Sequence, residues 1–332
     1  MKKLNQIKTF FAISTIAFFG LTSCSKDEDP VAPQPTTELT IAAKASGTAD
    51  LSILVAALVK TDLVETLKGT GPFTVFAPTN AAFTAAGITV TSINGLTTAT
   101  QIAALRETLL NHVVAGKTLA AMLTDNSYIK TLGKGSASSA NNLSMFVKKT
   151  TTAAGTTVKL NNNATVTTVD ISASNGVIHL VDKVIFAPSI VDLVAANPNF
   201  STLVGALGTN GLVPILIMAG PYTVFAPDNA AFTSLFTEIG TPTPAQTVNV
   251  LKYHVVNGNV LASAIPALIT ANTPVGTLLN TQTFTFSSTT AGVSITTNKV
   301  PVRPASKVVI TDIQGDNGVI HVIDKVLLPA TF

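Results

Sequence analysis

Apolar residues recur at helical spacing early in the chain. Four of them fall three or four positions apart, namely Leu51, Leu54, Val55 and Leu58. This spacing predicts a helix with one buried face, and Asp50 lies where an N-cap is expected. Two further stripes with the same period predict a helix near the middle of each half: Ile102, Leu105, Leu109 and Val113, then Val248, Leu251 and Val255.

Other segments have the patterns of strands. Residues 73–77 form a short apolar run that ends at Pro78, which predicts a buried strand. Val, Ile and Thr alternate with polar residues over two stretches, about 128–187 and 275–328, which predicts sheets. Helices come first and strands follow in each half, so the predicted fold class is α+β. Two pairs predict type I′ hairpin turns: Asn175-Gly176 and Asn317-Gly318.

The strongest signal in the chain is an internal repeat. Its first block reads GPFTVFAPTNAAF at 71–83 and GPYTVFAPDNAAF at 220–232, and its last block reads NGVIHLVDKV at 175–184 and NGVIHVIDKV at 317–326. Between the blocks stands a His-Val-Val segment, which begins at His112 in one copy and at His254 in the other. The repeat predicts two consecutive domains, residues 38–188 and 189–332. Their nearly direct join predicts a restricted orientation between them.

The N-terminus has the pattern of an export signal. Three lysines precede an apolar stretch at 10–21 that is too short to span a bilayer. Residues 1–24 end in Leu-Thr-Ser-Cys, which resembles the bacterial lipobox, and Cys24 is the only cysteine in the chain. We therefore expect a lipid anchor on Cys24. The alternative is an ordinary signal peptide with an incidental cysteine.

Residues 25–37 form a predicted tether. The acidic run at 25–29 resembles the surface-export signals of some Gram-negative lipoproteins, or it is a solvated spacer. The proline-rich run at 30–35 is expected to be semi-extended. A tether of this kind would hold the folded part away from the membrane.

Composition and charge exclude several classes of protein. Charged residues make up 11% of the chain, which is too few for disorder over most of its length. The net charge of +3 equals the contribution of Lys2, Lys3 and Lys8, so no basic patch favours nucleic acid as a partner. One cysteine excludes an intramolecular disulfide and zinc sites built on several cysteines.

The two signature blocks and the segment between them resemble the fasciclin domain. The resemblance extends over residues 38–332 as two consecutive copies. It implies helices packed on a β-sandwich-like wedge, with roles in adhesion and matrix contact, usually through tandem domains tethered to a cell surface. The Tyr-His pair of the family stands as Tyr253-His254 in the second copy and as Asn111-His112 in the first. The resemblance therefore makes Tyr253, His254 and His112 the candidate binding residues.

Other polar residues of the repeat are interpreted as structural. His179 and His321 lie in apolar segments, where a histidine is usually a hydrogen-bonded core residue. Asp182 and Asp324 are expected to lie inside valine-rich strands and to bond a neighbouring turn, because an unpaired buried charge is costly. Asp170 and Asp312, just before the predicted hairpins, are interpreted in the same way. Thr79 and Asp228 occupy matching positions before a short helix, and their exchange favours N-capping over catalysis.

No pattern of residues predicts catalysis. The sequence contains no GxSxG, no HExxH and no complete phosphate-binding loop around Gly133–Ser136. The sequence therefore predicts a protein that is not an enzyme, with no cofactor and no metal.

The predicted function is adhesion or matrix contact by an exported lipoprotein. It would be anchored to the cell envelope, at the outer membrane and exposed at the surface, and its partner would be a surface or matrix protein or a glycan. The alternative function is a carrier of a small apolar ligand or a glycan, which the mean hydropathy of +0.46 would suit.

Overall fold

The computed structural model describes residues 38–332, except 154, 219, 281, 291, 300–302 and 331. These residues belong to one compact unit. The predicted signal peptide, Cys24 and the tether lie outside the described residues, so they stay predictions. Among the described residues, no single helix is long and apolar enough to cross a membrane, and one pair reaches that length only across a bend of 104°.

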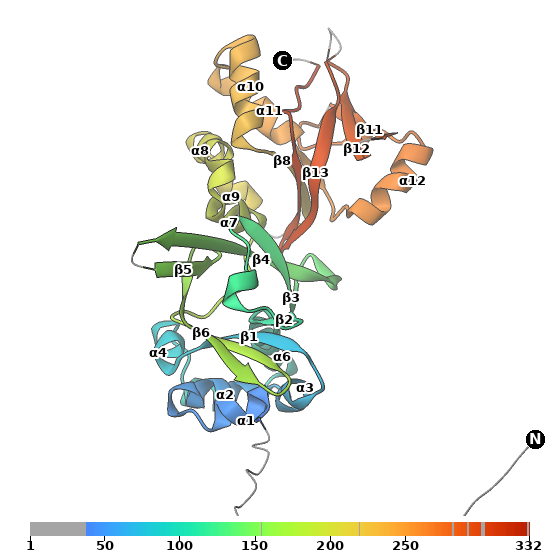
Figure 1. Cartoon of the computed structure of the whole chain (residues 1–332). Helices are drawn as coiled ribbons and strands as arrows, with labels where there is room; N and C mark the ends of the chain where they lie inside the picture. Colours follow the sequence, from blue (N-terminus) through green and yellow to red (C-terminus); the bar gives the residue numbers. More distant parts are fainter. Residues whose placement is uncertain are drawn as a thin grey trace, which may run out of the picture. The chain divides into compact units, whose positions relative to one another are not determined.

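We refer to the elements from α1 to β7 as the first domain (Figure 1). Its helices are α1 (Ile41–Ser46), η1 (Ala49–Leu51), α2 (Ser52–Lys60), α3 (Val64–Lys68), α4 (Asn80–Ala85), α5 (Val90–Asn94), α6 (Ala99–Leu110) and η2 (Ala120–Met122). Its strands are β1 (Phe73–Pro78), β2 (Val113–Ala115), β3 (Ser127–Gly135), β4 (Ser138–Thr152), β5 (Gly155–Leu160), β6 (Ala164–Ala173) and β7 (Gly176–Val181).

The elements from α7 to β14 form the second domain. Its helices are α7 (Ile190–Ala196), η3 (Pro198–Phe200), α8 (Ser201–Thr209), α9 (Val213–Leu216), α10 (Asn229–Ile239), α11 (Pro244–Tyr253), η4 (Ala262–Ala264) and α12 (Ile265–Thr270). Its strands are β8 (Tyr222–Pro227), β9 (Val255–Asn257), β10 (Val275–Gly276), β11 (Thr283–Thr289), β12 (Gly292–Thr297), β13 (Ser306–Gly315) and β14 (Gly318–Ile323).

The strands of the first domain close into a barrel in the order β1 to β7. Strand β1 pairs in parallel with β7, and the other neighbours are antiparallel. The second domain repeats the parallel pair as β8 and β14, in a sheet of order β10-β11-β12-β13-β14-β8-β9. These two domains of helices and strands confirm the predicted α+β class, although β1 and β8 lie among the helices in sequence.

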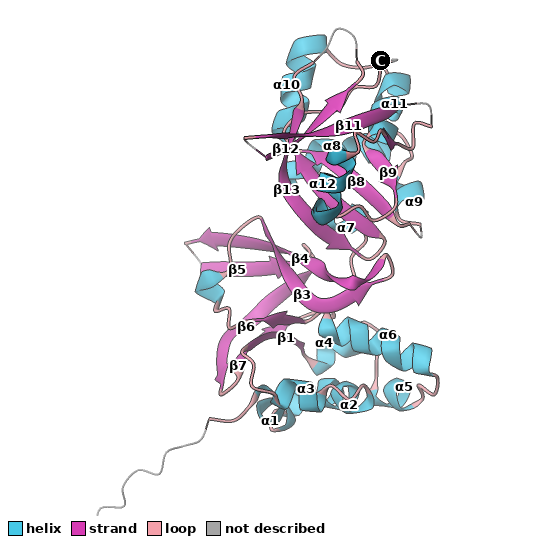
Figure 2. Ribbon diagram, turned by 90° about the vertical axis from the view of Figure 1, so that its right-hand side faces the viewer, coloured by secondary structure: helices cyan, strands magenta, loops and turns pink. Residues whose placement is uncertain are grey.

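Each domain has two apolar cores. In the first domain, helices α1 to α6 gather on one side of the sheet (Figure 2), and Phe83 and Leu109 are buried beneath them. A second cluster, which includes Phe76 and Met145, lies between the strands. The second domain has the same two clusters. Burial of these side chains is the main source of stability in both domains.

Two details of the helix predictions were wrong. Val113 and Val255 belong to β2 and β9, because helices α6 and α11 end before them. Asp50 lies inside η1 and does not cap α2. Instead, Asn80 reaches across from α4, and its Oδ1 atom accepts the Ile53 N–H at 3.0 Å. The cap therefore comes from another element, which helical spacing cannot reveal.

The hairpin turns were misplaced by one residue. Ala173 pairs with Gly176, so the loop consists of residues 174–175, and neither residue has the positive φ that a type I′ turn requires. Gly176 begins β7, where a Cβ atom would lie 1.9 Å from the Phe73 carbonyl oxygen. Glycine is needed here because two strands approach closely, and Gly318 meets the same constraint in the second domain.

Candidate functional site

His112 and His254 occupy matching buried positions just after a helix, and each is 2% exposed. The Nδ1 atom of His112 donates to the Thr108 carbonyl oxygen at 2.8 Å, and its Nε2 atom accepts the Ile185 N–H at 2.8 Å. The second domain repeats both bonds at 2.7 and 2.9 Å. Each ring therefore joins the end of its helix to the segment that follows the last strand of its domain.

Burial lowers the pKa of His112 and that of His254 from 6.5 to about 4, and the helical carbonyl that accepts from each ring opposes this shift. Both rings are therefore neutral at pH 7, with the hydrogen on Nδ1. Each ring nitrogen already bonds the backbone, which leaves neither for a metal or a substrate.

Tyr253 and Asn111 precede these histidines, and both side chains are fully buried. The Tyr253 hydroxyl donates to the Thr283 carbonyl oxygen at 2.7 Å, and burial raises its pKa to about 12. Asn111 donates through Nδ2 to the carbonyls of residues 185 and 186 and accepts from the Thr131 hydroxyl, all at 3.1 Å. The predicted binding residues thus lie inside the domains, and no polar atom of these side chains faces solvent.

His179 and His321 lie in the parallel strand pairs and are fully buried. They stack on Phe76 and Phe225, with ring centroids 5.3 and 5.4 Å apart. The Nε2 atom of each ring bonds a carbonyl oxygen, of Thr118 at 3.0 Å and of Val260 at 2.8 Å. The Nδ1 atoms accept the backbone N–H groups of Asp170 at 3.1 Å and Asp312 at 3.3 Å. Both nitrogens of each ring are used.

Asp170 and Asp312 also join distant backbone segments through hydrogen bonds. Both have positive φ, 60° and 59°, at an irregular point of β6 and β13. Their carboxylates accept the N–H groups of Ala120 and Ala262, each at 2.8 Å. The carboxylates therefore tie the chain after β2 or β9 to a distant strand.

Asp182 and Asp324 were expected inside strands, and this placement was wrong. Strands β7 and β14 end one residue earlier, and Asp182 is exposed while Asp324 is half-buried. Their carboxylates still accept backbone N–H groups, from Thr165 at 2.6 Å and Lys307 at 2.7 Å. A position just beyond the strand lets the carboxylate stay partly hydrated while it orients the neighbouring strand.

Thr79 and Asp228 have the geometry of N-caps. The Thr79 hydroxyl accepts the Ala82 N–H at 3.3 Å, and the Asp228 carboxylate accepts the Ala231 N–H at 2.8 Å. Each satisfies a backbone donor at the start of α4 or α10.

Sequence reasoning missed several side chains that bond between elements. Asn229 repeats the cap that Asn80 provides, and accepts the Thr202 N–H at 3.0 Å. Asn175 accepts the Ile41 N–H at 2.9 Å, and Asn317 repeats this bond to α7 at 3.0 Å. Their signal was present in the chain, because each asparagine stands at the same place in both copies of the repeat.

The polar side chains of the repeat therefore join separate backbone segments, and few of their hydrogen-bonding atoms remain for a substrate. Among residues 38–332 that the structure describes, no three His, Cys, Asp or Glu side chains form a group that could hold a metal ion.

The hairpin of β3 and β4 contacts the second domain. At its tip, Ser136 donates through its N–H to Asp316 Oδ1 at 2.8 Å and through its hydroxyl to the Asp316 carbonyl oxygen at 3.0 Å. Further along, the Ser144 hydroxyl accepts the Gln314 N–H at 2.9 Å. Tyr128 donates to the Leu193 carbonyl oxygen at 3.0 Å, and burial raises its pKa to about 12. These bonds fasten the hairpin to β13 and α7.

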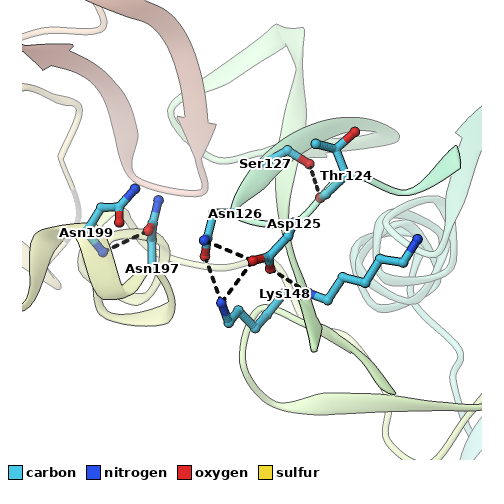
Figure 3. Close-up of polar contacts among 8 residues, drawn as sticks. Thr124, Asp125, Asn126, Ser127, Lys148, Asn197 and Asn199 are labelled. Atoms are coloured by element: carbon cyan, nitrogen blue, oxygen red, sulfur yellow. Dashed lines mark hydrogen bonds and ion pairs between the residues drawn. The ribbon is translucent and has the colours of Figure 1, made fainter. Parts of the chain in front are cut away.

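A smaller polar cluster lies at the start of β3 (Figure 3). The Asp125 carboxylate accepts the Lys149 N–H at 2.7 Å, which is the main cause that lowers its pKa, and the Lys148 ammonium at 3.1 Å. Asn126 also accepts from Lys148, at 3.2 Å. Figure 3 also shows Asn197 at the end of α7, where its Oδ1 atom accepts the N–H of residue 199 at 3.0 Å. Asp125 and Asn126 thus bind the turn before β3 to β4, and Asn197 closes the turn after α7.

The chain belongs to the fasciclin domain family, because the family model "Fasciclin domain" matches residues 49–188 and 198–329. Protein sll1483 of Synechocystis is 37% identical over 150 residues, which cover 43% of this chain and 74% of the relative. Transforming growth factor-beta-induced protein ig-h3 of Sus scrofa is 30% identical over 276 residues, which cover 79% of this chain and 35% of the relative.

A solved structure has the same fold. The domain pair from the insect cell adhesion molecule fasciclin I superposes with a TM-score of 0.52 at 15% identity, covering 84% of this chain and 97% of that chain. The predicted tandem fasciclin fold is confirmed by this similarity and by the family match. Fasciclin domains therefore occur in a cell adhesion molecule as well as in this chain.

Proposed function

We propose that this chain is a non-catalytic lipoprotein of the cell envelope that binds surface or matrix molecules through its two fasciclin domains. One observation carries the proposal: the repeated histidines use all their hydrogen-bonding atoms within the fold. His112, His254, His179 and His321 bond the backbone through both ring nitrogens. Each repeat is thus built as a folded support, and contact with a partner is left to its outer surface.

The proposed place of action rests on the N-terminal pattern. Exported proteins with a lipidated cysteine stay at a membrane, and more than one acyl chain gives stable anchoring. Cys24 and the acidic, proline-rich tether would present both domains away from the outer membrane surface. The likeness of the fold to a domain pair from an insect cell adhesion molecule supports adhesion as the purpose of this display.

The second function considered, a carrier of an apolar ligand, is less well supported. Two cavities with mainly apolar linings have volumes of about 20 and 30 Å³. A ligand pocket usually measures about 300–1,000 Å³. Neither cavity can hold a lipid, so high hydropathy is better explained by the two domain cores.

Attachment of cells that carry the full-length chain tests the proposal. Cells of a Gram-negative host would express the wild-type chain or the Cys24→Ala variant, and their retention on surfaces coated with matrix protein or glycan would be measured under flow. We expect wild-type cells to be retained above empty-vector cells. We expect the variant to leave the membrane fraction and to lose this retention. Retention equal to the empty vector, with wild-type chain accessible to external protease, would overturn the proposal.

A further inference from the structure

A cavity of about 300 Å³ lies where the turn between β5 and β6 faces the segment that joins the two domains. Its lining combines one aromatic ring with polar side chains: Phe186 and Pro188 from the joining segment, Asn161 and Asn163 from the turn, and Asp192 from the first turn of α7. The volume is at the lower end of the range for small-molecule sites.

Phe186 is exposed without a structural reason in the fold itself. Its side chain is 53% exposed, although the preceding residue, Ile185, is 3% exposed. The matching residue of the second domain is Leu328, which follows the residue that bonds His254 just as Phe186 follows the one that bonds His112. Leu328 is 2% exposed. The first domain thus exposes a large aromatic ring at the position where the second domain buries a leucine side chain. An exposed aromatic ring suits a binding role.

The polar side chains around the ring are each held by one atom and free to bind through another. Asn161 accepts the Phe146 N–H through Oδ1 at 2.8 Å, and Asn163 accepts the Lys183 ammonium through Oδ1 at 2.9 Å. Both Nδ2 groups are then oriented as donors. Asp192 accepts the N–H and hydroxyl of Ser189 through Oδ2, at 2.8 and 2.7 Å, which leaves Oδ1 as an acceptor. Groups fixed in this way lose little entropy on binding.

We propose that this cavity binds a neutral saccharide unit of a surface or matrix glycan. A sugar ring presents an apolar C–H face, which packs on the negative face of an aromatic ring such as that of Phe186. Its hydroxyls both donate and accept, so they match the amides of Asn161 and Asn163 and the carboxylate of Asp192. That carboxylate disfavours an anionic sugar. The inference rests on the proposed function, since it names the class of partner.

Titration of the full-length chain with neutral sugars tests the inference. The probes are the methyl glycosides of glucose, galactose, mannose and N-acetylglucosamine with their β-linked disaccharides, followed by saturation-transfer NMR and calorimetry. We expect at least one probe to bind, Phe186→Ala to weaken it at least tenfold and Asn163→Ala to weaken it two- to fivefold. Phe236→Ala is the matched control, because Phe236 is a 40% exposed phenylalanine on α10 outside the cavity lining. This control should bind as wild type does.

Three results would overturn the saccharide site. They are binding of no probe, equal binding by wild type and Phe186→Ala, or binding of short neutral peptides in competition with the sugars at higher affinity. Failure of this inference can be told apart from failure of the proposed function. If cells still attach to matrix when Phe186→Ala is displayed or when the sugars are in excess, adhesion stands and the saccharide site does not.

Discussion

The two domains share most of their interior bonds, with Asn111 and Tyr253 as an exception, and they differ at their edges. The four histidines, the aspartates Asp170 and Asp312, and the asparagines Asn175 and Asn317 form equivalent bonds in the two domains. By contrast, β3 and β4 have 9 and 15 residues, whereas β10 and β11 have 2 and 7. The long hairpin reaches the second domain, and the short one leaves its sheet open between β9 and β10.

This difference separates the features that both domains need for their fold from the features that are specific to this protein. Bonds that occur twice are needed to build either domain. The long hairpin and the exposed ring of Phe186 occur once, so they are not part of the bonding that both domains share. Single features are therefore the better places to look for a specific role of this chain.

The largest effect is expected from exchanging the residues before the two histidines. Tyr253→Asn would leave a cavity beside Phe284 and lose the bond to Thr283, at a cost of about 3–5 kcal/mol of unfolding free energy. Asn111→Tyr would overpack the first domain, because the Asn111 side chain is fully buried and bonds Thr131 and the carbonyls of residues 185 and 186. Denaturant unfolding followed by circular dichroism measures both. A neutral result for either exchange would show that the two sites are interchangeable, and would contradict the view that each residue fits only its own domain.

A nearly equal effect is expected from acid. The folded pKa of about 4 for His112 and His254 lies below the unfolded value of 6.5, so the unfolded chain binds more protons between these values. Stability from each neutral ring is complete above pH 6.5 and falls by about 3 kcal/mol as the pH approaches 4. Urea midpoints between pH 4 and 7 measure the slope, and His112→Gln should flatten it by removing the contribution of one ring, while those of His254 and of His321, whose pKa burial also lowers, remain. An unchanged slope would contradict the neutral, buried assignment.

A smaller effect is expected at the contact between the hairpin and the second domain. Asp316→Ala removes the acceptor for the Ser136 N–H and should lower the free energy of unfolding by about 1–2 kcal/mol. The matched control is Ser174→Ala, at the corresponding, exposed position of the first domain. This control should change the free energy of unfolding by less than about 0.5 kcal/mol, as surface substitutions usually do. Calorimetry of the full-length chain checks both. Equal effects would mean that the hairpin contact adds nothing.

The smallest effect is expected at the helix caps. Thr79→Ala and Asp228→Ala should each cost about 1 kcal/mol, because one backbone donor loses its acceptor. Exchange to the residue of the other domain, Thr79→Asp or Asp228→Thr, should cost about half of that or less. Thermal unfolding of the four variants gives the ranking. A larger loss for the exchanges than for the alanine variants would show that these side chains do more than cap.

Much of the fold could be predicted because it depends on short-range patterns. Helical stripes, the apolar run before Pro78 and the repeated blocks identified the elements and the doubled domain. The hairpin turn was misplaced because the side chain of Asn175 bonds a distant helix and Gly176 must pass close to Phe73. Those constraints come from residues about a hundred positions away, which turn preferences do not include.

The candidate site was harder to predict for the same reason. A histidine at the end of an amphipathic helix can face solvent or the core, and only the position of Ile185, 73 residues later, decides the case for His112. The contact between Ser136 and Asp316 joins residues 180 positions apart. Asp182 shows the opposite situation, because its chemistry indicated a structural hydrogen bond, although the bond goes to β6 where a turn was predicted and the residue lies just beyond its strand.

Equilibrium binding of the full-length chain to whole cells and matrix proteins tests the central claim most directly. That claim holds that the repeated residues build the domains and that the outer surface makes the contacts. Wild type would be compared at pH 7 with His254→Gln, after circular dichroism has shown that the variant is folded. We predict saturable binding of the same affinity for both proteins. Binding that is absent in wild type, or that is lost in the folded His254→Gln variant alone, would contradict the account.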